Sequence, residues 1–199
     1  MSKSVDYFMM TMSPWTYFGH ARFVDIAAKH GATINLKPVD LGRVFSVSGG
    51  LPLKQRAPQR QEYRLHELDR WSKVLGLPIN VTPKFAGTSA APGCKWLIAA
   101  QALGTPAALK LAGGLLRAYW AEDRDTSDGA TLAAVAAEQG LPAEKLANAA
   151  ASVEVAARLD ALTQEAMDRR VFGVPWYVCD GEPFWGQDRL DFLDRKLAK

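Results

Sequence analysis

The stretch VDYFMMTMSPW, residues 5–15, decides the expected fold of this chain of 199 residues. Its apolar first half is typical of a buried strand, whereas Ser13 and Pro14 are residue types preferred where a helix begins. We therefore expect a strand that turns directly into a helix at Ser13. The positive end of that helix would stabilise an anion or a thiolate beside the Ser13 hydroxyl. Taken alone, however, a Ser-Pro pair is also an ordinary helix start.

A second informative region, residues 171–194, lies far from the first and reads VFGVPWYVCDGEPFWGQDRLDFLD. Val174-Pro175 precedes a short apolar run, and Asp180-Gly181 is a hairpin-turn signal. We expect two strands joined by a tight turn, followed by a last helix with its leucines on one face. A strand–helix–strand start combined with Val-Pro before a terminal hairpin resembles the thioredoxin fold. That resemblance implies a cis proline facing the first strand–helix turn, although Val-Pro alone is also a plain strand start.

The rest of the chain is expected to be mostly helical. Residues 32–41 alternate enough to form a second strand, and residues 41–58, punctuated by glycine and proline, are expected to form a loop. Periodic apolar positions predict helices over residues 59–76, 95–103, 106–122 and 132–139, one from residue 143, and one over 153–169. The predicted fold class is α/β, a thioredoxin-like domain with a large all-helical insertion. The domain would comprise residues 1–59 and 151–199, and the insertion residues 60–150.

Bulk composition excludes several classes of protein. The net charge of +3 is too small and too evenly spread for a nucleic-acid surface. The chain has no signal-peptide pattern and no long apolar segment, so we expect a soluble, cytoplasmic protein without a membrane partner. Cys94 and Cys179 are far apart and have neither C-x-x-C nor metal-ligand spacing. Because Ser13 occupies the position of the thioredoxin thiolate, dithiol exchange is excluded.

The two ends together resemble the 2-hydroxychromene-2-carboxylate isomerases and kappa-class glutathione transferases, a DsbA-like branch of the thioredoxin superfamily. The segments that carry the resemblance are Ser13-Pro14-Trp15-Thr16-Tyr17, Phe172-Gly173-Val174-Pro175 and Phe184-Trp185-Gly186-Gln187-Asp188-Arg189-Leu190. The middle of the chain agrees in order and spacing, so the resemblance covers essentially the whole chain. It implies glutathione as cofactor and a small aromatic carboxylate as substrate. We also expect a homodimer.

The resemblance also implies roles for individual residues. Ser13 would be the catalytic residue, because its hydroxyl would stabilise the glutathione thiolate. The backbone of Val174 would pair with the cysteinyl main chain, and Asp188 would accept the γ-glutamyl ammonium, unless it is only a helix cap. The full set of expected glutathione contacts is Ser13, Trp15, Arg60, Val174, Pro175, Gln187 and Asp188. The expected ligands of the substrate carboxylate are Arg43, Lys54 and Arg56, although these residues could equally belong to a solvated surface loop.

The implied reaction is a glutathione-dependent isomerisation: thiolate addition, ring opening, bond rotation and elimination to the trans-benzylidenepyruvate. The alternatives are a kappa-like transferase or peroxidase at the same site, and a non-catalytic glutathione- or peptide-binding module. Three positions depart from the family pattern. Gly50 stands where an asparagine is expected, Trp176 where a smaller residue is usual, and Trp15 where tyrosine or phenylalanine is commoner. These departures concern the substrate more than the thiol cofactor.

Overall fold

The structure is a computed structural model that describes residues 3–199. Residues 1 and 2 of the predicted domain segment 1–59 lie outside the described part. One mixed sheet has the strand order β2-β1-β3-β4. Strand β1 pairs in parallel with β2 and antiparallel with β3, which forms a hairpin with β4. The strands are β1 (Ser4–Met9), β2 (Thr33–Pro38), β3 (Trp176–Cys179) and β4 (Glu182–Trp185). Both sequence regions that suggested the fold therefore meet at the centre of one sheet.

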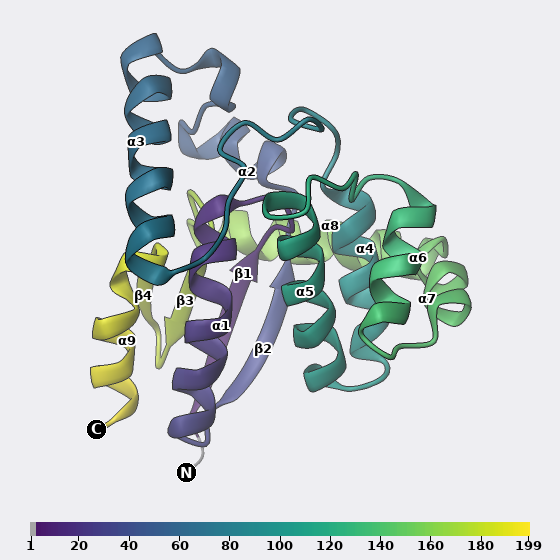
Figure 1. The fold of residues 1–199 in the computed structure, drawn as a ribbon. Coiled ribbons are helices and arrows are strands. Elements are labelled where there is room, and N and C mark those ends of the chain that lie inside the picture. Colours follow the sequence, from purple (N-terminus) through teal and green to yellow (C-terminus); the bar gives the residue numbers. More distant parts are fainter. Residues whose placement is uncertain (1–2) are drawn as a thin grey trace.

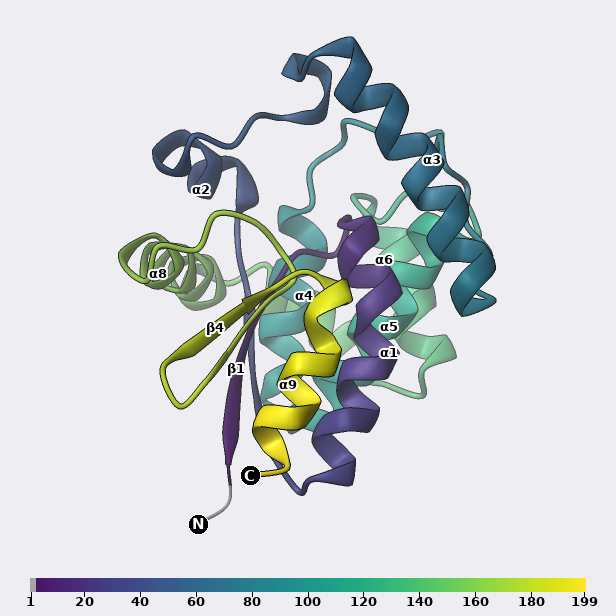
Figure 2. The same cartoon turned by 90° about the vertical axis from the view of Figure 1, so that its left-hand side faces the viewer.

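Helices cover both faces of this sheet. Helices α1 (Pro14–Lys29) and α9 (Leu190–Leu197) lie on one face, and α8 (Val153–Asp168) lies on the other (Figure 2). Side chains alternate along a strand, so Tyr7 enters the main core with α1, whereas Phe8 enters a smaller core with Trp176 on the α8 face.

The expected helical part is present, with ends that agree with the predicted ones to within a few residues. It contains α3 (Pro58–Leu75), α4 (Ala91–Gln101), α5 (Thr105–Trp120), α6 (Gly129–Glu138) and α7 (Ala143–Ala150), and α3 stands apart from the other four (Figure 1). Helices α4 and α5 pack on β2, and one core contains residues of the sheet and of these helices. The division between residues 1–59 with 151–199 and residues 60–150 therefore stays a prediction. None of the helices within residues 3–199 has the length and apolar character needed to cross a membrane.

The expectation of a loop over residues 41–58 is wrong. The segment begins with α2 (Leu41–Ser48) and also contains a short 3-10 helix, η1 (Leu53–Gln55). The Asp40 carboxylate accepts hydrogen bonds from the backbone N–H groups of Gly42 and Arg43, at 2.9 and 3.4 Å, and so caps the start of α2. Gly49, with a φ of 75°, ends the helix in the left-handed conformation that glycine adopts without strain. One of the glycines that suggested a loop, Gly49, is therefore the residue that ends a helix.

Candidate functional site

The strand–helix turn after β1 places Ser13 as expected, at the N-cap of α1. The Ser13 Oγ accepts a hydrogen bond from the Thr16 N–H at 3.2 Å, and Pro14 occupies the first turn, where a missing N–H costs nothing. The same hydroxyl donates to the carbonyl oxygen of Val174 at 3.3 Å. Ser13 is only 3% exposed, so its hydroxyl is held in a largely dry corner between the two ends of the chain.

The peptide bond between Val174 and Pro175 is cis, which agrees with the implication of the resemblance. The Pro175 carbonyl accepts a hydrogen bond from the Gly186 N–H at 2.9 Å. This bond fixes the start of β3 against the end of β4 and against the next element, the 3-10 helix η2 (Gln187–Arg189). The sequence therefore brings Ser13, Val174 and Pro175 together as predicted.

Gln187 and Asp188 lie at the start of η2. Gln187 is buried, and its Oε1 accepts a hydrogen bond from Arg22 Nη1 at 2.9 Å. Close approach to α1 requires Gly19, because a Cβ there would lie 2.8 Å from the Cβ of Gln187. The Asp188 carboxylate instead stays partly exposed and pairs with Arg189 at 2.7 Å. Neither η2 nor α9 has a side-chain cap at its start, so the alternative interpretation of Asp188 as a helix cap is wrong.

The three positions that depart from the family pattern have structural reasons. Trp176 is buried on the α8 face of the sheet, where its ring meets Phe172 edge-on at 4.7 Å, and therefore points away from α1. Gly50 is required by the Phe45 ring, because a Cβ at position 50 would lie 2.1 Å from a ring carbon. The remaining departure, Trp15, is half-buried at the start of α1 and packs on Phe18.

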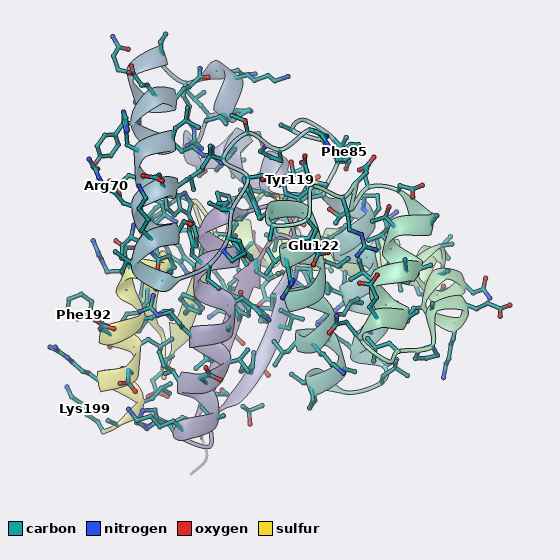
Figure 3. The ribbon with its side chains drawn as sticks, viewed as in Figure 1. Arg70, Phe85, Tyr119, Glu122, Phe192 and Lys199 are labelled. Carbon is teal, nitrogen blue, oxygen red and sulfur yellow. The ribbon has the colours of Figure 1, made fainter. Side chains whose placement is uncertain are left out.

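A cavity of about 1020 Å³ lies beside this corner. Met10 and Met12, which precede Ser13, form one part of its lining. The other walls come from residues 39–42, from Leu53, from α3, from residues 81–91 and from the end of α5. There the Tyr119 hydroxyl donates to the Phe85 carbonyl at 3.3 Å (Figure 3). Most of the lining is apolar or aromatic. Such a cavity can hold a planar aromatic molecule next to the Ser13 corner.

The cations expected to bind carboxylates are not brought into this lining. Arg43 pairs with Asp160 at 2.8 Å, and Lys54 and Arg60 are exposed. Arg56 stacks on Phe45 and donates to the Leu51 carbonyl at 2.8 Å. Their proposed contacts with ligands stay predictions.

The cavity does contain one cation that the sequence interpretation missed, Arg64 of α3. The available signal was helical spacing: Pro58, Gln61 and Leu65 also line the cavity, which defines the inward face of α3.

The remaining reactive side chains have structural roles. Burial raises the pKa of the Cys94 thiol to about 11, which keeps it protonated and unreactive. Burial lowers the pKa of His20 to about 4, and the neutral ring bridges the Tyr7 hydroxyl and the Leu109 carbonyl. Within residues 3–199, no three His, Cys, Asp or Glu side chains gather as metal ligands.

The fold and this corner identify the class of protein. The family described as DSBA-like thioredoxin domain matches residues 4–198, and the chain therefore belongs to that family. A 2-hydroxychromene-2-carboxylate isomerase of Sphingobium xenophagum is 27% identical, with 99% of each chain covered. Glutathione s-transferase kappa 2 of Caenorhabditis elegans is also 27% identical, with 96% of this chain and 92% of the relative covered.

A solved structure of a 2-hydroxychromene-2-carboxylate isomerase is similar to this one over nearly its whole length. The TM-score is 0.86 at 26% identity, and 98% of this chain and 94% of the other are covered. The recognised resemblance and the thioredoxin-like fold with its helical addition are thus confirmed.

Proposed function

We propose that this protein is a glutathione-dependent isomerase of the 2-hydroxychromene-2-carboxylate type. The observation that carries the proposal is the Ser13 hydroxyl, held at the N-terminus of α1 within 3.3 Å of the backbone that precedes cis Pro175. A helix N-terminus favours a negative charge, and a hydroxyl donor favours a thiolate over a thiol. The names of relatives that match along almost the whole chain support the isomerase reaction.

The residues of the corner fit glutathione. The Val174 carbonyl, just before the sheet, can accept a hydrogen bond from the ligand's cysteinyl N–H, like an added strand. The partly exposed Asp188 carboxylate can accept the γ-glutamyl ammonium, since its pairing with Arg189 leaves further acceptor capacity. The contact of η2 with Gly19 places Asp188 beside α1, about two turns from Ser13.

The role of Ser13 follows from its hydrogen bonds. Its single proton now goes to the Val174 carbonyl, while its oxygen is held by the Thr16 N–H. When a ligand amide takes the carbonyl, the Ser13 proton can turn towards the sulfur without leaving any group unpaired. Bound glutathione would supply a thiolate that adds to the electrophilic carbon of the chromene and leaves after ring opening and bond rotation. The cavity beside Met10 and Met12 would hold the aromatic substrate and exclude water.

The decisive experiment measures the concentration of free glutathione thiol during turnover of 2-hydroxychromene-2-carboxylate. We expect full conversion to an isomer of equal mass with glutathione far below the substrate concentration, and no loss of free thiol. The matched sample without glutathione should show only the uncatalysed rate. Stoichiometric loss of thiol with a thioether product would contradict the proposal.

A kappa-like transferase or peroxidase is the second candidate, because one relative carries that name at 27% identity. It would use the same corner and differ only in whether the thiol is returned. A non-catalytic glutathione-binding module would bind the thiol without lowering its pKa, so measuring thiol ionisation in the complex separates it from both enzymes. The homodimer and the cytoplasmic location stay predictions, for which sedimentation and cell fractionation are the direct measurements.

A further inference from the structure

Within residues 3–199, Arg64 is a partly buried cation without a counter-charge. Its guanidinium lies over the ring of Trp120, 5.7 Å from the centroid, and lines the cavity. Among residues 3–199 it forms no ion pair and no hydrogen bond. A buried charge normally has a partner, because removing it from water is costly. The stacking on Trp120 offsets only part of that cost.

The charged groups around Arg64 do not neutralise its positive charge. Burial, and then the positive charge of Arg56, lower the pKa of Arg64, and Arg60 acts in the same way on Arg56. Two carboxylates also line the cavity, but neither serves Arg64. The Asp40 carboxylate caps α2, and Glu62 is exposed, two positions from Arg64 on α3, where side chains do not face each other.

The rest of the cavity lining indicates what kind of molecule should carry the anionic group. Around Arg64 the lining is aromatic or apolar, with Tyr119, Trp120, Met10 and Met12 among its residues. A guanidinium in such surroundings pairs best with a carboxylate, which can take two parallel N–H donors. An apolar or aromatic wall at the same time favours a flat hydrocarbon body over a hydrated inorganic anion.

We propose that Arg64 is the residue that selects an anionic substrate: it binds the carboxylate of a planar aromatic acid in the cavity beside Ser13. This inference rests on the proposed function for the identity of the acid, but not for the binding itself. It assigns the carboxylate to the cavity wall, in place of the surface cations Arg43, Lys54 and Arg56. The Arg64 guanidinium would stay stacked on Trp120, and no hydrogen bond or ion pair to another of residues 3–199 would have to be broken for the ligand to bind.

The test is calorimetric titration without glutathione, which separates binding from turnover. The probes are chromone-2-carboxylate, an aromatic acid of the expected shape, and its neutral carboxamide. We expect Arg64→Leu to weaken carboxylate binding by roughly 10- to 100-fold, the range for a lost charge-assisted pair, and carboxamide binding by less than about threefold. Arg64→Lys should recover part of the carboxylate affinity, because it keeps the charge but not the planar fork.

The matched control is Arg70→Leu, which removes the same charge from the same helix. Arg70 is exposed, pairs with Glu67, and lies on the outer side of α3 (Figure 3). This variant should bind both probes as the unmodified protein does. Equal loss in the Arg64 and Arg70 variants would mean a general field effect and would overturn the proposal.

A second arm titrates glutathione, which carries carboxylates of its own. Its affinity should be unchanged in Arg64→Leu. Loss of glutathione affinity with unchanged chromone-2-carboxylate affinity would place the thiol's carboxylate on Arg64 and overturn the assignment. If Arg64-dependent carboxylate binding is found but the chromene is not isomerised, the proposed function fails and this inference stands.

Discussion

The corner formed by Ser13 and Val174 differs from the wall formed by α3 in how polar groups are satisfied. In the corner, the Ser13 hydroxyl and the Val174 carbonyl are already paired with each other across the two ends of the chain. In the wall, Arg64 has an aromatic neighbour, Trp120, but no paired carboxylate among residues 3–199. The first region is complete without a ligand, whereas the second has an excess of positive charge.

This difference indicates that the two regions recognise different ligands. A corner built from backbone and one hydroxyl recognises features common to any peptide-like thiol, so it suits a cofactor. An unpaired cation in an apolar cavity recognises an anionic group on an apolar molecule of suitable shape, so it suits a substrate. Two of the three departures from the family pattern, Trp15 and Trp176, flank the corner, although Ser13, Val174 and Pro175 themselves match the family.

The largest effect is expected from breaking the corner with Ser13→Ala. Loss of the cap should cost about 1 kcal/mol of stability. Activity in saturating glutathione should fall by roughly two orders of magnitude or more, as for loss of one preorganised donor. The control is Ser152→Ala, since Ser152 caps α8, on the face of the sheet opposite α1, through the Val155 N–H at the same 3.2 Å. It should lose similar stability at full activity; full activity in Ser13→Ala would exclude the assigned role.

The next largest effect tests whether the corner extends to Asp188. Asp188→Asn should weaken glutathione binding by about 1.5–3 kcal/mol, the range for a charged hydrogen bond, as measured by calorimetric titration. The melting temperature should hardly change, because Asp188 caps no helix. Asp191→Asn provides the control: this exposed carboxylate lies three positions further on and only approaches Arg22 at 3.7 Å. Unchanged affinity in Asp188→Asn would remove this residue from the site.

A smaller effect is expected from Gly50→Asn, at the departure from the family pattern that lies between α2 and η1. The new Cβ would meet the Phe45 ring, so we expect a loss of about 1–3 kcal/mol of stability from overpacking, measured by denaturant unfolding. The double variant with Phe45→Ala should recover part of that loss, because it removes the obstructing ring. If Gly50→Asn is as stable as the unmodified protein, the segment between α2 and η1 is free to move and the packing explanation for Gly50 fails.

The smallest effect concerns the surface cations. Lys54 is exposed, but its Nζ would lie 3.7 Å from a Cβ at Gly87, a residue of the cavity lining. Lys54→Gln should therefore raise the KM of an anionic substrate by only about two- to threefold, as for a screened surface charge. Arg43→Gln, in which the lost charge is already paired with Asp160, should change KM less. A larger rise for Arg43 than for Lys54 would show that the wall is not organised as described.

Sequence reasoning succeeded where local chemistry decides the structure. The Ser13-Pro14 helix start, the Asp180-Gly181 turn and the leucine face of α9 all formed as expected, because each depends on residues close in sequence. It failed for α2, although Asp40 and Gly49 are regular helix-end signals, because the many glycines and prolines between residues 41 and 58 favoured a loop.

Arg64 was missed for a different reason. Helical spacing could place Arg64 on the inward face of α3, but its role depends on Trp120 of α5, and local spacing does not encode which distant helix lies opposite that face. Arg43 shows the converse, since its partner Asp160 comes from α8 and withdraws a cation that the sequence alone left available. Helix positions could be predicted, whereas the partners across helices could not.

The distance along the chain between the two halves of the corner has a consequence for biosynthesis. Ser13 and Val174 are 161 positions apart, and β1 pairs with β3 only after almost all of the protein has been made. At a synthesis rate of about 5–20 residues per second, this separation corresponds to roughly 8–30 s during which one side of β1 has no partner strand. A ribosome-bound chain that stops before Val174 would thus have the helix that polarises a thiol but not the backbone that holds one.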